Sequence, residues 1–330
     1  METSTANTTI SPPRLFATLM QGLNTVATNI RLILLPLLLD LLLWLGPHLS
    51  VKNLLQTSIN NGLNQLPTDI PNLTSAIATM KAAWENVGDL NLFSALRSIP
   101  VGLASMMSGN LSIKSPLGTS TLYMITDSQS AMLLALGLFL LGILLGAMYF
   151  NGLAQATSTE KHKTTLQLIF WQALQCLMLF IAMVVVLMIV FIPVWIFSQF
   201  IALISPGFIN VALIVVGIFI IWLLLPMVFS AHGIFVEHRG FMQSILISIR
   251  MVRYYLPGTG LFILIALLIS YGLSLLWNSP PVDSWFLLIG IIGHAFIASA
   301  VLAATFIYYQ GGLRWMREVM RRVPAGKKTA

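Results

Sequence analysis

The sequence is poor in charged residues and contains a single cysteine. Charged residues make up 8% of its 330 positions, whereas hydrophobic residues make up 57% and the mean hydropathy is +0.89. Because about a quarter of the residues in a soluble domain are charged, this composition indicates a protein that folds in a lipid bilayer. The lone Cys176 excludes an intrachain disulfide, and its position in an apolar run predicts a small core residue.

The sequence also lacks catalytic and nucleotide-binding motifs. It contains no His-Glu-x-x-His, no Gly-x-Ser-x-Gly, no phosphate-binding glycine loop and no pair of carboxylates inside an apolar run. The formal net charge of +7 would suit nucleic acid, but the basic residues flank apolar runs, where they set orientation and meet anionic lipid. We therefore expect no catalytic site, no cofactor and no nucleic-acid partner.

Six apolar runs predict membrane-spanning helices. A helix needs about 20 apolar residues to cross ~30 Å of hydrocarbon, and only the first run is clearly shorter than this. That first run contains Asp40 and is followed by no cleavage site, so it predicts an anchor that stays in the mature protein. The six predicted spans are Leu32–Leu45, Ala131–Phe150, Cys176–Phe197, Phe208–Phe229, Leu261–Trp277 and Trp285–Tyr309.

The basic residues predict the orientation of these spans. Of 17 Lys and Arg residues, four lie in the long segment between the first two spans, which the positive-inside rule does not count, and 17 − 4 = 13 lie on the cytoplasmic side if the N-terminus is inside. The short outer loops near Ser205-Pro206 and Pro280-Pro281 contain no Lys or Arg. We expect a multi-pass protein of the plasma (inner) membrane with both termini in the cytoplasm.

The chain divides into four parts by composition. Residues 1–46 predict an interfacial helix and the first span, 47–128 an extracytoplasmic helical cap inserted in the first hairpin, 129–313 five further spans, and 314–330 a basic cytoplasmic tail. Within the cap, helix-period spacing of apolar residues occurs in Val51–Leu66, Ile77–Val87 and Leu92–Met107, the last interrupted by Pro100.

A threefold pattern organises the predicted spans. An amphipathic stretch precedes each outward-going span, near residues 15–30, 166–175 and 241–256. Such a helix can lie in the interface with its apolar stripe in the lipid. We therefore predict an all-α integral membrane fold of about six spans in three hairpins, each preceded by an amphipathic interfacial helix. The alternative is that these stretches lengthen the spans that follow, and it is strongest for residues 166–197, which are nearly continuously apolar.

One part of the third hairpin resembles a known group of proteins. The segments Leu225–Phe229, Glu237-His238-Arg239-Gly240, Ser244–Arg250 and Tyr255–Gly258 are similar to a pattern in poorly characterised bacterial polytopic membrane proteins. These include the membrane domains fused to some glycerophosphodiester phosphodiesterases. The resemblance covers about 35 of the 330 residues. It implies a bacterial membrane fold of interfacial helices and hairpins, and it carries over no active-site residue.

Two polar residues stand inside predicted spans. Asp40 is nine residues from Arg31 and His294 is nine from Trp285, so each lies about 13–14 Å from its own interface at 1.5 Å per residue. An ionisable group at that depth usually faces the protein interior and has a partner. Asp40 and His294 therefore form a candidate pair, either as a structural lock or on a proton or substrate path. The alternative is an Asp40 bonded to backbone and a His294 satisfied by a neighbouring hydroxyl.

Other polar residues gather near the predicted inner face. His232, Glu237 and His238 have no recognised metal-ligand spacing, so we expect no metal. Arg250 and Arg253 project from one side of the third amphipathic stretch and could contact lipid headgroups or merely set orientation. We expect the tail to bind anionic lipid through its basic residues, which are Arg314, Arg317, Arg321, Arg322, Lys327 and Lys328. Gly142 and Gly146 predict close helix packing within the chain.

Two functional interpretations from different classes remain. The first is a non-enzymatic membrane scaffold or a lipid-contacting or transport-associated component. The second is an intramembrane enzyme or carrier that uses Asp40 and His294. A transporter usually places several polar residues or broken helices at the midplane, whereas the third to fifth spans are almost purely apolar, which favours the first. The expected partners are a bilayer with anionic lipid at its cytoplasmic face and either another membrane protein or a second copy of the chain.

Overall fold

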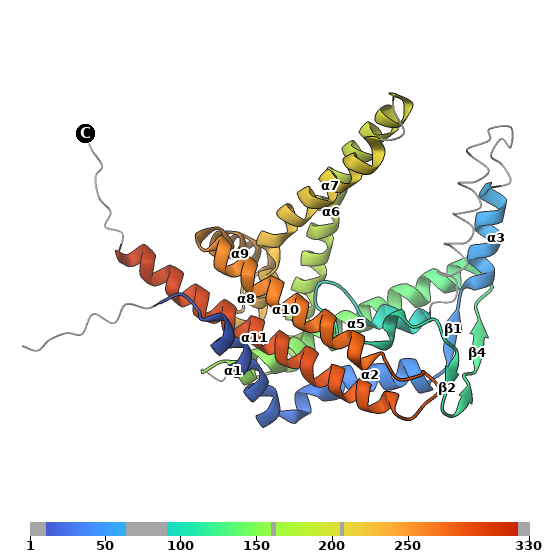
Figure 1. The fold of residues 1–330 in the computed structure, drawn as a ribbon, viewed down its shortest axis with the longest axis horizontal. Coiled ribbons are helices and arrows are strands. Elements are labelled where there is room, and N and C mark those ends of the chain that lie inside the picture. The colour runs from blue at the N-terminus through green and yellow to red at the C-terminus, as the bar shows by residue number, and fades with distance from the viewer. Residues whose placement is uncertain (1–10, 64–90, 160–162, 205–207, 323–330) are drawn as a thin grey trace, which may run out of the picture. The chain divides into compact units, whose positions relative to one another are not determined.

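A computed structural model describes residues 11–63, 91–159, 163–204 and 208–322 (Figure 1). The predicted helical spacing in Ile77–Val87, the outer loop at Ser205-Pro206 and the tail beyond residue 322 lie outside the described residues. The chain forms two compact units. The first unit comprises Met1–Asn29, Phe150–Leu268 and Ala300–Ala330, and the second unit comprises Ile30–Tyr149 and Ile269–Ser299.

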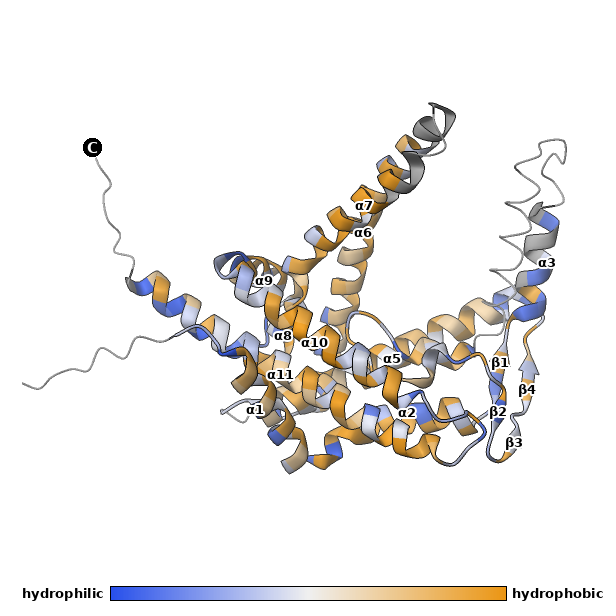
Figure 2. Ribbon diagram, viewed as in Figure 1, coloured by the Kyte–Doolittle hydropathy of each residue, from blue (hydrophilic) through white to orange (hydrophobic). Residues whose placement is uncertain are grey.

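Long apolar helices dominate the described residues. Five stretches are long and apolar enough to cross a membrane. A sixth span is possible at the start of the described chain, where two helical stretches are bent relative to each other at a short break. The first stretch is α1 (Leu15–Thr28), and the second is η1 (Ile30–Ile33) followed by α2 (Leu34–Leu45). The five are α5 (Ser128–Thr157), α6 (Leu166–Ile204), α10 (Leu256–Trp277), α11 (Leu287–Arg322) and a run of α7 (Phe208–Leu224), η4 (Leu225–Met227) and α8 (Ser230–Val236). Figure 2 shows that α6 and α7 are mostly apolar where they are coloured by hydropathy. The chain is therefore a multi-pass membrane protein by helix length and composition.

The second amphipathic stretch is not a separate helix. α6 runs without a break over 39 residues and includes Pro193, so residues 166–175 lengthen the following apolar helix, as the alternative interpretation had it. By contrast, α1 and α9 (Phe241–Tyr254) are distinct helices of 14 residues each. A position of these two helices in the membrane interface stays a prediction.

The core of the first unit is built where α9, α10 and α11 meet. Its buried side chains include an aromatic stack of Phe262 on Tyr308, with ring centroids 4.1 Å apart, and of Phe229 on Tyr308, at 5.9 Å. Helix α1 joins this core through Leu15 and Leu19. At Gly22, a Cβ atom would overlap the Ala300 carbonyl, so α1 is seated backbone to backbone on α11. Stacked aromatic rings and small residues thus fix the helices that carry the polar site described below.

The part of the predicted cap that the structure describes is less helical than expected. The helix predicted from residue 51 is present as α3 (Lys52–Leu63). The stretch Leu92–Met107 is not a helix, because only the short turns η2 (Leu92–Leu96) and η3 (Met107–Gly109) form at its ends. Short strands complete the region: β1 (His48–Ser50) pairs in parallel with β4 (Leu122–Met124), and β2 (Lys114–Ser115) pairs antiparallel with β3 (Gly118–Thr119).

Residues 92–109, named here the inserted segment, are packed inside the second unit. Val101 and Leu103 are almost completely buried, and η2 and η3 contact α2. A Cβ atom at Gly142 or Gly146 of α5 would overlap the backbone carbonyl of Leu96 or Val101. The two glycines were predicted to pack against a helix. They instead allow the backbone of the inserted segment to lie directly against α5. The apolar spacing of that segment reflects its burial and not a helix.

Candidate functional site

Asp40 of α2 holds the inserted segment through three hydrogen bonds. The Ser105 hydroxyl donates to Oδ1 at 2.5 Å, the Met107 N–H donates to the same oxygen at 3.0 Å, and the Met106 N–H donates to Oδ2 at 3.1 Å. The Asp40 side chain is completely buried. Both carboxyl oxygens are therefore used to satisfy groups that have no helical partner, as buried non-helical backbone requires.

His294 lies beside Asp40 but does not share these hydrogen bonds. Its Nδ1 is 3.7 Å from Asp40 Oδ2, and it has no hydrogen-bond partner among the described residues. The structure thus brings the two predicted residues together within the second unit. An Asp40 bonded to backbone was the alternative interpretation. The sequence could not show which N–H groups it would accept from, because every residue other than proline offers one.

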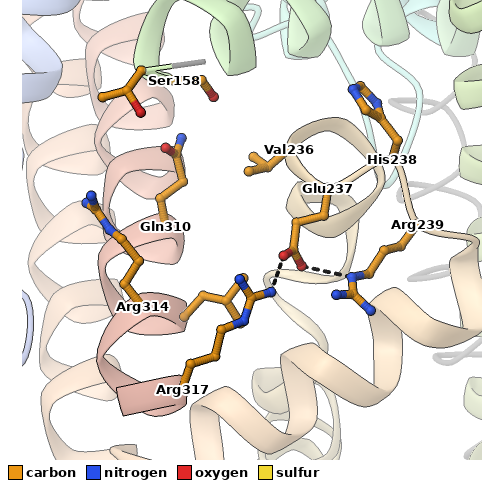
Figure 3. A pocket seen from close by; sticks show the side chains of 10 residues that line it. Ser158, Val236, Glu237, His238, Arg239, Gln310, Arg314 and Arg317 are labelled. Carbon is orange, nitrogen blue, oxygen red and sulfur yellow. Dashed lines mark hydrogen bonds and ion pairs between the residues drawn. The ribbon is translucent and has the colours of Figure 1, made fainter. Parts of the chain in front are cut away.

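A polar cavity of about 490 Å³ lies in the first unit (Figure 3). It is formed where the ends of α5 and α8 meet the last turns of α11. Figure 3 shows Glu237 between Arg239 and Arg317, with Gln310 and Arg314 of α11 across the opening from Glu237. We name it the basic pocket, and the residues that line it are Ser158, Thr159, Val236, Glu237, His238, Arg239, Gln310, Leu313, Arg314 and Arg317.

Positive charge exceeds negative charge in the basic pocket. Glu237 accepts a hydrogen bond from Arg239 Nε at 2.9 Å and also pairs with Arg317. Arg314 adds a third guanidinium group, for which the described part of the chain offers no ion-pair partner. Three arginines and one glutamate give a formal charge of 3 − 1 = +2. The side chain of Arg239 is 35% exposed and that of Arg317 is 46% exposed. The pocket is therefore open to a ligand.

Polar side chains of α5 and α6 anchor the loop that carries Glu237. Asn151 Nδ2 donates to Gln172 Oε1 at 2.8 Å, and Gln172 Nε2 lies 3.4 Å from His238 Nδ1. Gln175 Oε1 accepts from the Phe241 N–H at 2.9 Å at the start of α9. Gln172 is completely buried. Gln172 and Gln175 of the second amphipathic stretch therefore face the protein and hold this loop.

A second cavity of about 410 Å³ adjoins the basic pocket. The two share Thr159, Gln310 and Arg314, and all of their lining residues belong to the first unit. We name it the amide pocket, and its lining residues are Gln21, Asn24, Thr25, Thr28, Ala156, Thr157, Thr159, Ile307, Gln310 and Arg314. Gln310 Nε2 donates to Thr157 Oγ1 at 3.1 Å on the shared wall. The polar side of α1 thus lines a cavity in the first unit.

The other predicted polar residues lie apart from this pocket or serve different contacts. Arg250 and Arg253 are exposed on α9 and do not line either cavity. His232 is buried, with Nε2 2.8 Å from Thr305 Oγ1 and its ring 4.4 Å from that of Phe306. Within the described ranges, no group of three or more His, Cys, Asp or Glu residues could hold a metal ion.

Comparison with known proteins finds no counterpart: no family model, no curated protein and no solved structure matches the chain. The function is therefore inferred from the basic pocket and its surroundings.

Proposed function

We propose that this chain is a non-enzymatic, lipid-contacting membrane protein that binds the phosphate of an anionic phospholipid headgroup in the basic pocket. The observation that carries the proposal is a cavity with a formal charge of +2, in which Arg239 and Arg317 pair with Glu237 and Arg314 lines the same cavity without such a pair. A guanidinium group matches the geometry of phosphate with two parallel hydrogen bonds. Cavities of roughly 300–1,000 Å³ are typical of small-ligand sites.

Glu237 prepares the pocket for an anion. By pairing with Arg239 and Arg317 it holds two long side chains in place, so that less side-chain entropy is lost when a phosphate binds. Arg314 is left to contact the phosphate directly. A basic pocket at helix ends also agrees with the predicted cytoplasmic position of this part of the chain, where anionic lipid gathers next to Lys and Arg.

An intramembrane enzyme or carrier at Asp40 and His294 has less support. Their separation of 3.7 Å favours a functional pair. However, the two oxygens of Asp40 already accept three hydrogen bonds from the inserted segment, and the side chain is completely buried. Such a carboxyl group is better suited to hold backbone in place than to exchange protons with a substrate.

Lipid retention by the purified full-length protein tests the proposal. The protein is incubated with vesicles of phosphatidylcholine, with or without phosphatidic acid, and the retained lipids are counted by native mass spectrometry. We expect Arg314→Ala to weaken retention of phosphatidic acid about tenfold, because a charge-assisted hydrogen bond contributes about 1.5–3 kcal/mol. Arg253→Ala removes the same charge from an exposed site outside the pocket and is expected to have little effect.

Two results would contradict the proposal. Equal losses in Arg314→Ala and Arg253→Ala would mean that surface charge alone attracts the lipid. Displacement of phosphatidic acid by an equal concentration of inorganic phosphate would mean that the pocket binds a soluble anion and not a lipid headgroup.

A further inference from the structure

The amide pocket suggests what kind of headgroup the basic pocket receives. We infer that the two cavities form one site, and that its ligand is a phospholipid whose phosphate carries a polyhydroxylated group such as glycerol or a cyclitol. This inference rests on the proposed function and deepens it. Thr159, Gln310 and Arg314 line both cavities. A phosphate bound to Arg314 therefore places its substituent next to the amide pocket.

The side chains that α1 contributes have the chemistry of a hydroxyl-binding surface. Thr25 Oγ1 donates to the Gln21 carbonyl at 2.8 Å, and Thr28 Oγ1 donates to the Asn24 carbonyl at 2.8 Å. Because these hydroxyl protons are used within the helix, the Thr25 oxygen can act as an acceptor, and the Thr28 oxygen, which already accepts from Asn29 Nδ2 at 3.1 Å, retains a second lone pair. The amides of residues 21 and 24 offer both donors and acceptors. A ligand hydroxyl, which donates and accepts, is complementary to this set.

The charge distribution divides the site into two chemically different halves. Arg239 and Arg317 line only the basic pocket, whereas Arg314 is the single charged residue of the amide pocket. An anionic group is therefore favoured at one end and an uncharged polar group at the other. A ligand with two phosphates, one in each cavity, fits this arrangement less well, because the second phosphate would meet mostly neutral amides and hydroxyls.

Helix α1 is fixed firmly enough to take part in recognition. Gly22 lies on the side of α1 that contacts α11, where a Cβ atom would overlap the Ala300 carbonyl and the Ala304 methyl group. Leu15 and Leu19 pack against the core of the first unit. These contacts hold the four α1 residues that line the amide pocket in place. Little further ordering of α1 is therefore required when a ligand binds.

A comparison of three anionic lipids tests the inference with the full-length protein. Vesicles of phosphatidylcholine contain phosphatidic acid, phosphatidylglycerol or phosphatidylinositol at matched net charge, and retained lipid is counted by native mass spectrometry. We expect the wild type to retain phosphatidylglycerol and phosphatidylinositol over phosphatidic acid. Gln21→Ala and Asn24→Ala should each reduce this preference about fivefold, the usual effect of one lost hydrogen bond, and leave retention of phosphatidic acid unchanged.

Gln243→Ala is the matched control. Gln243 is an exposed amide on α9, another 14-residue helix of the first unit, and it lines neither cavity. Thermal unfolding of each variant shows whether α1 remains folded. Equal retention of the three lipids by the wild type, or an unchanged preference in folded Gln21→Ala and Asn24→Ala, would overturn the inference. If Arg314→Ala still weakened retention of phosphatidic acid, the proposed function would stand; if it did not, both would fail.

Discussion

The two polar sites of this protein differ in how fully their hydrogen-bonding groups are used. In the second unit, Asp40 is completely buried, and both of its oxygens accept hydrogen bonds from the inserted segment. In the first unit, Arg314 and Arg317 line an open cavity whose positive charge exceeds its negative charge. A buried polar group with all partners in place stabilises a fold, whereas a half-compensated group in a cavity is available to a ligand. The comparison separates a structural site from the proposed binding site.

The largest expected effect is the loss of the Asp40 side chain. Asp40→Ala leaves the Ser105 hydroxyl and the N–H groups of Met106 and Met107 buried without an acceptor. Each such donor costs about 1–3 kcal/mol, so we expect the free energy of unfolding to fall by about 3–5 kcal/mol. Thermal unfolding in detergent measures this change, and retention of phosphatidic acid by the protein that remains folded should equal that of the wild type.

His294 provides the comparison for this result. Its Nδ1 is within 3.7 Å of Asp40 but makes no hydrogen bond to a described residue. His294→Gln should therefore destabilise the protein by less than about 1 kcal/mol, the usual net contribution of one hydrogen bond. If His294→Gln were as damaging as Asp40→Ala, the pair and not the inserted segment would be what Asp40 stabilises.

An effect smaller than that of Asp40→Ala is expected from added volume at the contact between α5 and the inserted segment. In Gly146→Ala the new methyl group overlaps the Val101 carbonyl, and such overpacking costs about 1–3 kcal/mol. Gly137→Ala is the matched control on the same helix, because a Cβ atom there meets no atom within 4 Å. That substitution should be neutral or stabilise the protein by about 0.5–1 kcal/mol. Equal unfolding temperatures for the two variants would show that the inserted segment does not press on α5.

The smallest effect concerns the response of the second unit to acid. Burial lowers the pKa of His48 below its ordinary value of 6.5, against opposing backbone contacts from Gly46 and Ser112. The unfolded chain therefore takes up the proton first as pH falls, and stability is lost as pH decreases through and below 6.5. His48→Gln should reduce the difference in unfolding temperature between about pH 7.5 and about pH 5.5. A difference as large as that of the wild type would assign the acid response to another group.

The parts of the fold that the sequence predicts are those governed by long-range hydropathy. The apolar runs ending at Phe150 and Tyr309 correspond to α5 and α11, because a helix satisfies all of its backbone hydrogen bonds within one segment, as lipid requires. The spacing over residues 92–107 gave a wrong prediction. Apolar side chains recur there because the segment is buried on several sides, and its backbone is satisfied by Asp40 from elsewhere in the chain.

The candidate site was predictable only in part. The basic tail was expected to meet lipid, and two of its residues, Arg314 and Arg317, line the basic pocket. Arg250 and Arg253, which the helical pattern singled out, are exposed outside it. Arg317 belongs to the pocket because it pairs with Glu237, which lies 80 positions away along the chain. Periodicity describes which residues share one helix face, but it cannot show which loop reaches that face.

The unbroken length of α6 has a consequence for the surrounding membrane. A helix of 39 residues rises about 58 Å, nearly twice the ~30 Å depth of the acyl-chain layer. Only 6% of the most apolar 18-residue stretch of this helix is buried within the protein. Standing upright, it would carry apolar side chains past the headgroups, and tilting, local thickening of the bilayer or both would relieve this hydrophobic mismatch. Acyl-chain length is therefore expected to bias the inclination of α6.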